Sequence, residues 1–425
     1  MLPSSNGRIW IEVDDLLEYF RGSVTPTGIG RVQLEIIPHL FEATGGNVGI
    51  VQLGQTARNV RILSRDELVR LTDGNAFLSK YGNSGRLLPV HQLRRYLTAH
   101  VRRRLHDAFS AKAHLRRFRA EVRPGDTLLN LGASWSHHGF ARTVATLRHD
   151  HGLRFAMMIH DVLPISHPEY VSPGFIPGFT RWFWEMEKVW DLVLTPSNAS
   201  AREVARLLER EGRPLPPIRR VPFGVGFSSD GSANATAADT TRRTHVLYVS
   251  TIEIRKNHRL LVDVWERLIA RHGAAAVPDL VFAGKWGWEI ADLRRRLEAS
   301  AMLGGKVRVM ERLSDEALAD LYRTAHFTVF PSFCEGWGLP IGESLAFGRY
   351  CIAADATSIP EVGGPLVDLH PPGDVDAAHA LIEAALFTPD LIAEKEARIR
   401  AARPLPDWRG TADAIVAAIA ETARG

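Results

Sequence analysis

The chain has 425 residues and a mass of 47.2 kDa, a length that predicts two domains and leaves room for a third. Its residues are 45% hydrophobic and 24% charged, which is ordinary for a globular protein and excludes a disordered, collagen-like or coiled-coil chain. The formal net charge is +4, but residues 91–123 carry ten Lys and Arg against two acidic residues. This segment therefore has a charge of +8, and the rest of the chain has a charge of −4.

The two cysteines, Cys334 and Cys351, are too few for a disulfide framework or a zinc site. Residues 1–20 lack a basic region followed by an apolar one, so they are not typical of a signal peptide. No run reaches the roughly 18 apolar residues that span a bilayer. We therefore expect a soluble, reduced protein of the cytoplasm.

Short apolar runs alternate with longer helical patterns along the chain, which predicts parallel sheets with crossover helices. We expect strands at Arg8–Val13, Val48–Leu53, Thr127–Leu131, Phe155–Ile159, Leu192–Thr195, His245–Val249, Leu280–Phe282, Val307–Met310, Thr328–Phe330 and Tyr350–Ala353. We expect helices at Gly30–Phe41, Ser197–Glu211, Arg259–Arg271, Ile290–Ser300, Ser314–Thr324 and Pro340–Ala346. Residues 226–243 are small and polar without periodicity, which predicts a linker between two doubly wound α/β domains. Ligands of such sheets bind at the carboxyl ends of the strands, so two facing domains would form a cleft.

The most informative stretch is residues 330–364, where an apolar strand is followed by a glycine-rich loop and a helix. Pro340 suits the first helical position and Gly338 lets the backbone approach a ligand. The unpaired amides at this helix start predict binding of phosphate or sugar oxygens. Glu335 in the loop and Glu343 in the first turn are spaced to hold two separate polyol units. The structural alternative is that Glu343 only complements the helix dipole and Glu335 is solvated.

A basic pair, Arg255 and Lys256, follows another predicted strand and precedes a helix. A nucleoside-diphosphate leaving group gathers negative charge as its bond breaks, so preorganised cations at this point would lower the barrier. Near the N-terminus, Gly28 and Gly30 offer a tight turn and exposed amides before a helix that begins near Arg31. A dinucleotide-binding fingerprint is excluded there, because Gln33 occupies the third glycine position and no acidic residue ends the next strand.

The spacing of Glu335 and Glu343 resembles the Glu-x7-Glu pair of retaining glycosyltransferases of family 4, which have the GT-B fold. Other stretches resemble elements of that family in the family's order: residues 25–36 its glycine loop, 157–170 its His-Asp loop, 220–227 its pre-linker stretch, 248–268 its Gly-Thr-Leu-Glu-Pro-Arg-Lys-Asn signature and 405–415 its closing Trp helix. Three positions depart from the family pattern, with Ser250 in place of Gly, Ile254 in place of Pro and Phe223 in place of Asn. The Ser250 departure bears on how closely the backbone can approach the diphosphate.

The resemblance implies a GT-B protein with two Rossmann-like domains facing across a cleft. Its parts would be an acceptor-side domain at residues 1–225, a linker at 226–243, a nucleotide-sugar-binding domain at 244–404 and a helix at 405–425 that crosses back to the first domain. The implied activity is metal-independent, retaining transfer of a hexose, best matched by mannose from GDP-mannose. The acceptor would be a glycan or lipid-linked saccharide, as in cell-surface polysaccharide assembly.

The resemblance also implies roles for single residues. Those at the reacting centre would be Glu335, His160, Arg255 and Lys256. The remaining donor-binding residues would be Gly28, Gly30, Ser250, Thr251, Gly336, Trp337, Gly338, Leu339 and Glu343. Asp161 and Tyr170 would lie on the acceptor side.

We expect no required metal ion and no other cofactor. Asp374 and Asp376 match an Asp-x-Asp metal motif, but helix capping explains them. Asp14 and Asp15 are interpreted as a strand-end pair, and the His137–His138 stretch is interpreted as a solvated loop. Two other functions stay open. One is a GT-B phosphorylase or a sugar-nucleotide epimerase, and the other is a membrane- or polyanion-binding scaffold with an inactive cleft.

The basic segment at residues 91–123 has apolar residues at steps of four, which predicts an amphipathic helix. It would either pack with a solvated basic face or dock on an anionic membrane surface from the cytoplasmic side. Nucleic acid is not expected as a partner, because no nucleic-acid-binding motif accompanies the charge.

Overall fold

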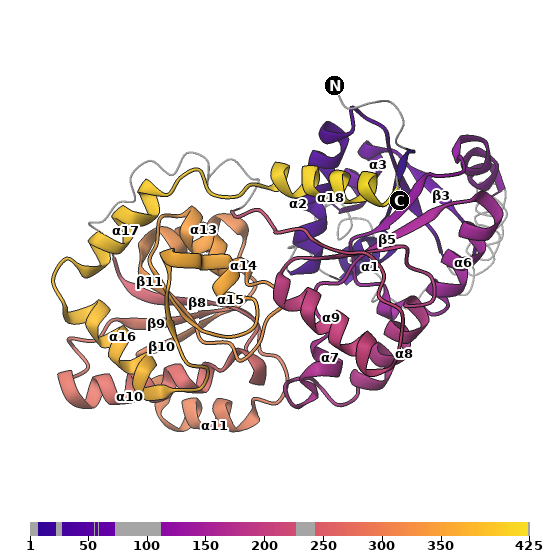
Figure 1. Cartoon of the computed structure of the whole chain (residues 1–425). Helices are drawn as coiled ribbons and strands as arrows, with labels where there is room; N and C mark the ends of the chain where they lie inside the picture. The colour runs from indigo at the N-terminus through magenta and orange to yellow at the C-terminus, as the bar shows by residue number, and fades with distance from the viewer. Residues whose placement is uncertain are drawn as a thin grey trace, which may run out of the picture.

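The structure is a computed structural model that describes residues 7–22, 28–54, 56–57, 59–72, 112–226 and 243–423. It contains two α/β domains, each built on its own mainly or wholly parallel sheet (Figure 1). The doubly wound α/β architecture expected from the sequence is confirmed. Residues 91–111 of the basic segment and 227–242 of the expected linker lie outside the described residues.

The first domain has a seven-stranded sheet in the order β3-β2-β1-β4-β5-β6-β7. Its pairs are parallel except for β2 with β3, which is antiparallel. The strands are β1 (Ile9–Glu12), β2 (Val48–Gln52), β3 (Arg61–Leu63), β4 (Thr127–Asn130), β5 (Arg154–Met158), β6 (Leu192–Thr195) and β7 (Ile218–Arg220). Strands β1, β4 and β5 are adjacent, so the loops that follow them meet at one edge of the sheet.

The second domain has a six-stranded sheet in the order β10-β9-β8-β11-β12-β13, and all of its pairs are parallel. The strands are β8 (His245–Val249), β9 (Asp279–Ala283), β10 (Val307–Met310), β11 (Ala325–Phe330), β12 (Cys351–Ala354) and β13 (Asp368–His370). Because β8 and β11 are neighbours, the loops at their carboxyl ends lie side by side.

Helices connect these strands in both domains. In the first domain they are α1 (Asp14–Gly22), α2 (Ile29–Ala43), α3 (Arg65–Thr72), α6 (Phe140–His151), α7 (Leu163–Ser166), α8 (Ile176–Met186) and α9 (Asn198–Arg210), with short 3-10 helices η1 (Ser134–Ser136) and η2 (Pro168–Tyr170). In the second they are η4 (Ile254–Lys256), α10 (His258–His272), α11 (Ala291–Ala299), α12 (Ala301–Gly304), α13 (Asp315–Thr324), α14 (Leu339–Ala346), α15 (Ile359–Gly363), η5 (Gly364–Leu366), α16 (Val375–Phe387) and α17 (Leu391–Ala401).

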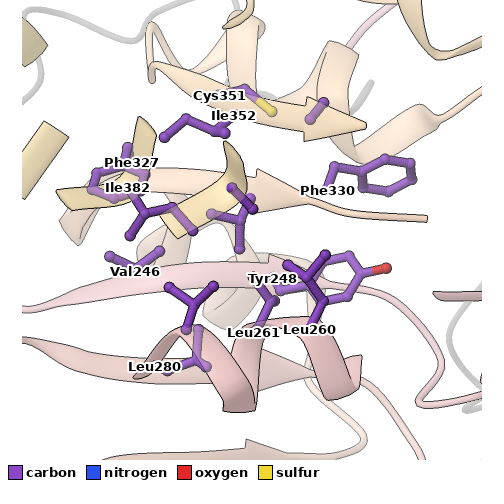
Figure 2. Packing of buried hydrophobic residues seen from close by; sticks show 14 of the residues in the cluster. Val246, Tyr248, Leu260, Leu261, Leu280, Phe327, Phe330, Cys351, Ile352 and Ile382 are labelled. Atoms are coloured by element: carbon purple, nitrogen blue, oxygen red, sulfur yellow. The ribbon is translucent and has the colours of Figure 1, made fainter. Parts of the chain in front are cut away.

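The core of the second domain forms where apolar strand residues meet the helices on the sheet (Figure 2). Leu260 and Leu261 of α10 and Ile382 of α16 are each at most 2% exposed. They pack with buried side chains from four strands, among them Val246, Tyr248, Leu280, Phe327, Phe330, Cys351 and Ile352. Burial of a side chain of this kind stabilises a fold by roughly 1.5–3 kcal/mol, so this core holds the ends of β8 and β11 in register.

The last helix, α18 (Trp408–Thr422), returns to the first domain and packs against α2, as Figure 1 shows in yellow beside indigo. Trp408 is buried, and its Nε1 donates a hydrogen bond to the carbonyl oxygen of Gly226 at 3.2 Å. Gly224 fits here because a Cβ at its position would lie 2.3 Å from the backbone nitrogen of Trp408. In the part of the chain that the structure describes, no helix is long and apolar enough to cross a membrane.

Candidate functional site

The two loops that follow β8 and β11 bring a carboxylate between two cations. Lys256 Nζ donates to Glu335 Oε1 at 2.6 Å, and Arg255 Nη1 donates to Glu335 Oε2 at 2.6 Å. Arg255 Nη1 also donates to the carbonyl oxygen of Cys334 at 2.9 Å, while its Nη2 lies 3.0 Å from Glu253 Oε1. The side chains of Arg255, Lys256 and Glu335 are only 17%, 13% and 8% exposed. The sequence placed these three residues in one site, but it did not show that they pair directly with one another.

Arg255 and Lys256 influence the pKa of Glu335, and Glu335 in turn influences the pKa of Arg255. Burial raises the pKa of Glu335, but the nearby Arg255 and Lys256 more than offset that effect and bring the pKa to about 2. Burial works against the charge on Arg255, yet the carboxylates of Glu335 and Glu253 raise the pKa of Arg255 above its usual value. Burial also raises the pKa of Glu253. Glu335 is therefore ionised at neutral pH and can only accept hydrogen bonds.

The loop that carries Glu335 is held by two hydroxyl side chains at the start of α15. Ser358 Oγ lies 2.8 Å from the carbonyl oxygen of Glu335 and 2.9 Å from that of Trp337, and its single proton is shared between them. Thr357 Oγ1 accepts from the backbone nitrogen of Glu335 at 2.8 Å and donates to its carbonyl oxygen at 2.9 Å. Thr357 and Ser358 thus fix the loop, and they fall within residues 330–364, although the sequence assigned neither of them a role.

Helix α14 begins at Leu339, one residue before the predicted start at Pro340, and Gly338 takes a φ of 121° at its N-cap. Glu343 is therefore the fifth residue of the helix and lies just past the first turn, in which the sequence had predicted it. It is 6% exposed, and its Oε2 accepts a hydrogen bond from the Tyr322 hydroxyl at 2.7 Å. Burial raises the pKa of Glu343, an effect that the nearby Arg31 opposes.

Arg31 links Glu343 to the first domain. It lies on α2, and its Nη2 donates to Oδ1 of Asp315, the first residue of α13, at 2.6 Å. Gly28 forms the expected turn with a φ of 53° at the N-cap of α2, which begins at Ile29, two residues before the expected start near Arg31. Gly30 lies inside this helix, where a Cβ would meet the Tyr19 ring at 3.6 Å. Arg31 and Tyr322 had no recognisable sequence signal as site residues.

His160 and Asp161 come from the first domain, directly after β5, and lie against the loop of the second domain that carries Glu335. A Cβ on Gly336 would lie 2.2 Å from the carbonyl oxygen of His160 and 3.0 Å from Cβ of Asp161. His160 Nε2 is 2.9 Å from the carbonyl oxygen of Leu131. A carbonyl oxygen can only accept, so Nε2 carries the proton and Nδ1 of the neutral ring is the acceptor. Burial lowers the pKa of His160 and so favours this neutral form.

Tyr170 also crosses the domain interface. Its ring stacks on Phe333 of the loop after β11, with centroids 4.9 Å apart and planes 6° apart. The Tyr170 ring also stacks with the ring of His167, with centroids 6.5 Å apart. The sequence had placed Tyr170 on the acceptor side, but nothing in the local pattern indicated its contact with Phe333.

The remaining predicted donor-side residues lie in the same region with different local contacts. Trp337 is buried and packs edge-on against Phe223 at 5.9 Å, so its ring joins the core of the first domain. Ser250 Oγ is 3.2 Å from His258 Nε2. The backbone of Ser250 lies close to that of Gly284, where a Cβ would be 1.9 Å from the carbonyl oxygen of Ser250. Thr251 lies beside Gly287.

The acidic and histidine pairs away from this cluster have structural partners. Asp374 Oδ1 accepts from the backbone nitrogen of Ala377 at 2.9 Å, which confirms the capping interpretation. Asp15 Oδ2 accepts from Gln33 Nε2 at 2.8 Å. The solvated-loop interpretation is wrong for His137, whose side chain is 15% exposed and lies 3.7 Å from Asp14, but His138 is exposed. Among the described residues, no group of three or more His, Cys, Asp or Glu could hold a metal ion.

Comparisons with known proteins show which sequences and folds the chain is similar to. The family model described as "Glycosyl transferases group 1" matches residues 235–403. The chain is 29% identical over 368 residues to O-antigen chain mannosyltransferase B of Escherichia coli, covering 85% of this chain and 87% of that protein. Two solved structures share its fold. A glycosyltransferase from Rickettsia africae has a TM-score of 0.60 and 16% identity, covering 98% of this chain and 99% of that one. A UDP-forming α,α-trehalose-phosphate synthase from Burkholderia xenovorans has a TM-score of 0.61 and 14% identity, with the same coverage.

The match to the family model covers the sheet that carries Glu335, Arg255 and Lys256, and the relative from Escherichia coli extends the similarity over both domains. The solved structures support the same two-domain architecture over nearly their whole length. The chain therefore has the GT-B fold, and residues 235–403 match the family model described as "Glycosyl transferases group 1".

Proposed function

We propose that the chain transfers mannose from GDP-mannose to a glycan or lipid-linked saccharide during the assembly of a cell-surface polysaccharide. The observation that carries the proposal is the similarity to an O-antigen chain mannosyltransferase over 85% of the chain. This similarity spans both domains, so it supports a proposal for the donor and for the acceptor.

Arg255 and Lys256 would bind the diphosphate of the donor. Lys256 donates an ammonium hydrogen bond to Glu335, and an ammonium group has three donors. Phosphate oxygens accept such bonds strongly because both partners are charged. As the bond between the sugar and the diphosphate breaks, the fixed cations would stabilise the growing negative charge, which is the role that a metal ion has in other transferases.

The two glutamates would bind different parts of the donor. Glu335 is ionised and acts only as an acceptor, so it suits the hydroxyl groups of the sugar and the positive charge that develops at the anomeric carbon. Glu343 lies further along α14 and would accept from the ribose hydroxyls. The free amides at Gly336–Leu339 would support the sugar or phosphate oxygens beside Glu335.

In the first domain, Nδ1 of the neutral His160 would accept a hydrogen bond from a sugar hydroxyl. Asp161 and Tyr170 would contact the acceptor. We propose retention by attack on the same face from which the diphosphate departs. The bond from the anomeric carbon to the phosphate oxygen breaks, the bond to the acceptor oxygen forms, and the acceptor proton goes to the departing phosphate. No protein nucleophile and no metal ion is needed for these steps.

The test is turnover of purified protein with GDP-mannose, other GDP-sugars and UDP-sugars, using a mannose-terminated acceptor, with and without EDTA. We expect GDP release only with GDP-mannose, an α-linked product by NMR and unchanged rates in EDTA. A UDP-sugar preference would overturn the donor, an inverted anomer would overturn the mechanism, and inhibition by EDTA would overturn metal independence. Hexose 1-phosphate formed with orthophosphate would instead indicate a phosphorylase, and interconversion of nucleotide sugars an epimerase.

The +8 segment at residues 91–123 is the part that we propose meets an anionic membrane carrying a lipid-linked acceptor. The test is co-sedimentation with anionic and with neutral vesicles. We expect the wild-type protein to bind only the anionic vesicles, and we expect this binding to fall when the arginines of the segment are replaced by glutamine. Loss of donor binding in that variant, with vesicle binding unchanged, would contradict this division of roles.

A further inference from the structure

The N-terminal turn of α9 belongs to the first domain but directs its polar groups at the second. Ser197 Oγ donates to the carbonyl oxygen of Gly336 at 3.0 Å. The backbone nitrogens of Asn198 and Ala199 each donate to the Glu361 carboxylate at 2.8 Å. These two N–H groups are among those that a helix leaves unpaired at its start, so a carboxylate of the other domain here serves as their partner.

The hydroxyl groups of Ser197 and Ser200 can donate one hydrogen bond each, one to the loop of Gly336 and one to the loop of His160. Ser200 Oγ is 3.1 Å from the carbonyl oxygen of His160, and its backbone nitrogen donates to Ser197 Oγ at 3.0 Å. Each hydroxyl has one proton to give. With the Ser197 proton on Gly336 and the Ser200 proton on His160, both carbonyl oxygens are paired.

This pairing is needed because the two loops approach so closely. A Cβ on Gly336 would lie 2.2 Å from the His160 carbonyl oxygen, and Ser197 and Ser200 are 0% and 2% exposed. Without the hydroxyls, the carbonyl groups of the buried Gly336 and the half-buried His160 would lose these donors, which disfavours the contact between the domains.

We propose that Ser197 and Ser200 are positioning residues for the transfer reaction, and that Glu361 docks the second domain on the start of α9. The serines hold the His160 loop against the loop of Glu335, so that groups from the two domains face one substrate. This inference rests on the proposed function for what the substrate is. Arg255, Lys256 and Glu343 all lie on the second domain, so nucleotide binding does not require the serines.

The experiment compares S197A, S200A, the double variant and E361Q with wild type. S134A is the matched control, because Ser134 is another buried serine of the first domain, and its Oγ accepts from Trp182 Nε1 at 3.2 Å. We measure the Kd for GDP by calorimetry, kcat and KM with the donor that wild type uses, and the radius of gyration with GDP by X-ray scattering. Each serine variant is expected to lose kcat on the order of tenfold, with the Kd for GDP within about twofold of wild type and S134A unchanged in kcat.

A double variant with wild-type kcat would overturn the proposal, and so would a Kd for GDP that rises in step with the loss of kcat. If the serine variants do not fold, E361Q decides, because it is expected to lower kcat and enlarge the GDP-bound radius of gyration. A wild type that turns over no nucleotide sugar would refute the proposed function instead. The scattering comparison would still test the docking of the domains, and equal radii for wild type and E361Q would overturn it.

Discussion

Lys256 Nζ and Glu335 Oε1 lie 2.6 Å apart, and Arg255 binds the other oxygen of the same carboxylate. The three groups come from the ends of adjacent strands, β8 and β11, so the sheet fixes their separation before a substrate binds. Charges that need no reorganisation during a reaction stabilise its transition state most effectively. The arrangement therefore suits a reaction in which a charged group departs.

Replacing Lys256 by alanine is expected to reduce kcat by about 10-fold to 150-fold, because a hydrogen bond to a charged group contributes about 1.5–3 kcal/mol. Steady-state turnover with the preferred donor measures this loss. Lys188→Ala is the control, since Lys188 is an exposed lysine of the first domain. Equal kcat values for Lys256→Ala and Lys188→Ala would show that Lys256 does not take part in the reaction.

The low pKa of Glu335 predicts a pH-dependent contribution to stability. Its pKa is about 2 in the fold and about 4.3 in an unfolded chain. The lower folded value stabilises the protein fully above the unfolded pKa, and this stabilisation is lost as the pH falls towards 2. The difference in unfolding free energy between wild type and Glu335→Gln should therefore narrow by about 2 kcal/mol between pH 7 and pH 3. Urea unfolding at a series of pH values measures it, and a difference that stays constant over this range would contradict the low pKa.

The sheets were predictable where most residues of a strand are apolar. Every strand expected from the sequence overlaps an observed one, as with His245–Val249, because a strand covered on both faces needs a continuous apolar run. Strands β3, β7 and β13 were missed, since each has three residues and includes charged or polar side chains such as Arg61, Arg219 and Asp368. Edge pairing of this kind depends on the neighbouring strand and leaves little pattern in the sequence.

The site was predictable where a loop carries its own signature, and not where two domains meet. Glu335 and Lys256 stand in motifs with a glycine, a helix start or a basic pair. Ser197 lies 139 residues from its partner Gly336, and Arg31 lies 284 residues from Asp315. A serine or an arginine at a helix start has many local uses, so only the packing of the domains reveals these contacts.

Tyr322→Phe tests the environment of Glu343, because it removes the phenol that donates to the buried carboxylate at 2.7 Å. We expect a loss of stability of about 1–3 kcal/mol and weaker binding of the donor nucleotide, since Glu343 loses its fixed orientation. Tyr350→Phe is a matched control, because the Tyr350 hydroxyl donates to Asp368 at 2.6 Å in the same domain. Both variants should lose stability in urea unfolding, but only Tyr322→Phe should raise the Kd for GDP. Equal Kd values would show that Glu343 does not bind the nucleotide.

Gly336→Ala is expected to separate donor binding from transfer. The added Cβ would lie 2.2 Å from the His160 carbonyl oxygen, which is closer than real Cβ contacts, so one of the two loops must move. Both loops are anchored, and the loop of Glu335 is held by Ser358, so we expect the domains to separate slightly rather than the loop to refold.

In that case kcat falls by at least tenfold while the Kd for GDP stays close to wild type, because the contacts of Arg255 and Lys256 lie within the second domain. Calorimetry with GDP and steady-state turnover together measure this split. Gly174→Ala is the control, since a Cβ at Gly174 meets nothing within 4 Å. A Gly336→Ala variant that binds GDP normally and also turns over normally would show that the close approach of His160 and Gly336 is not required during transfer.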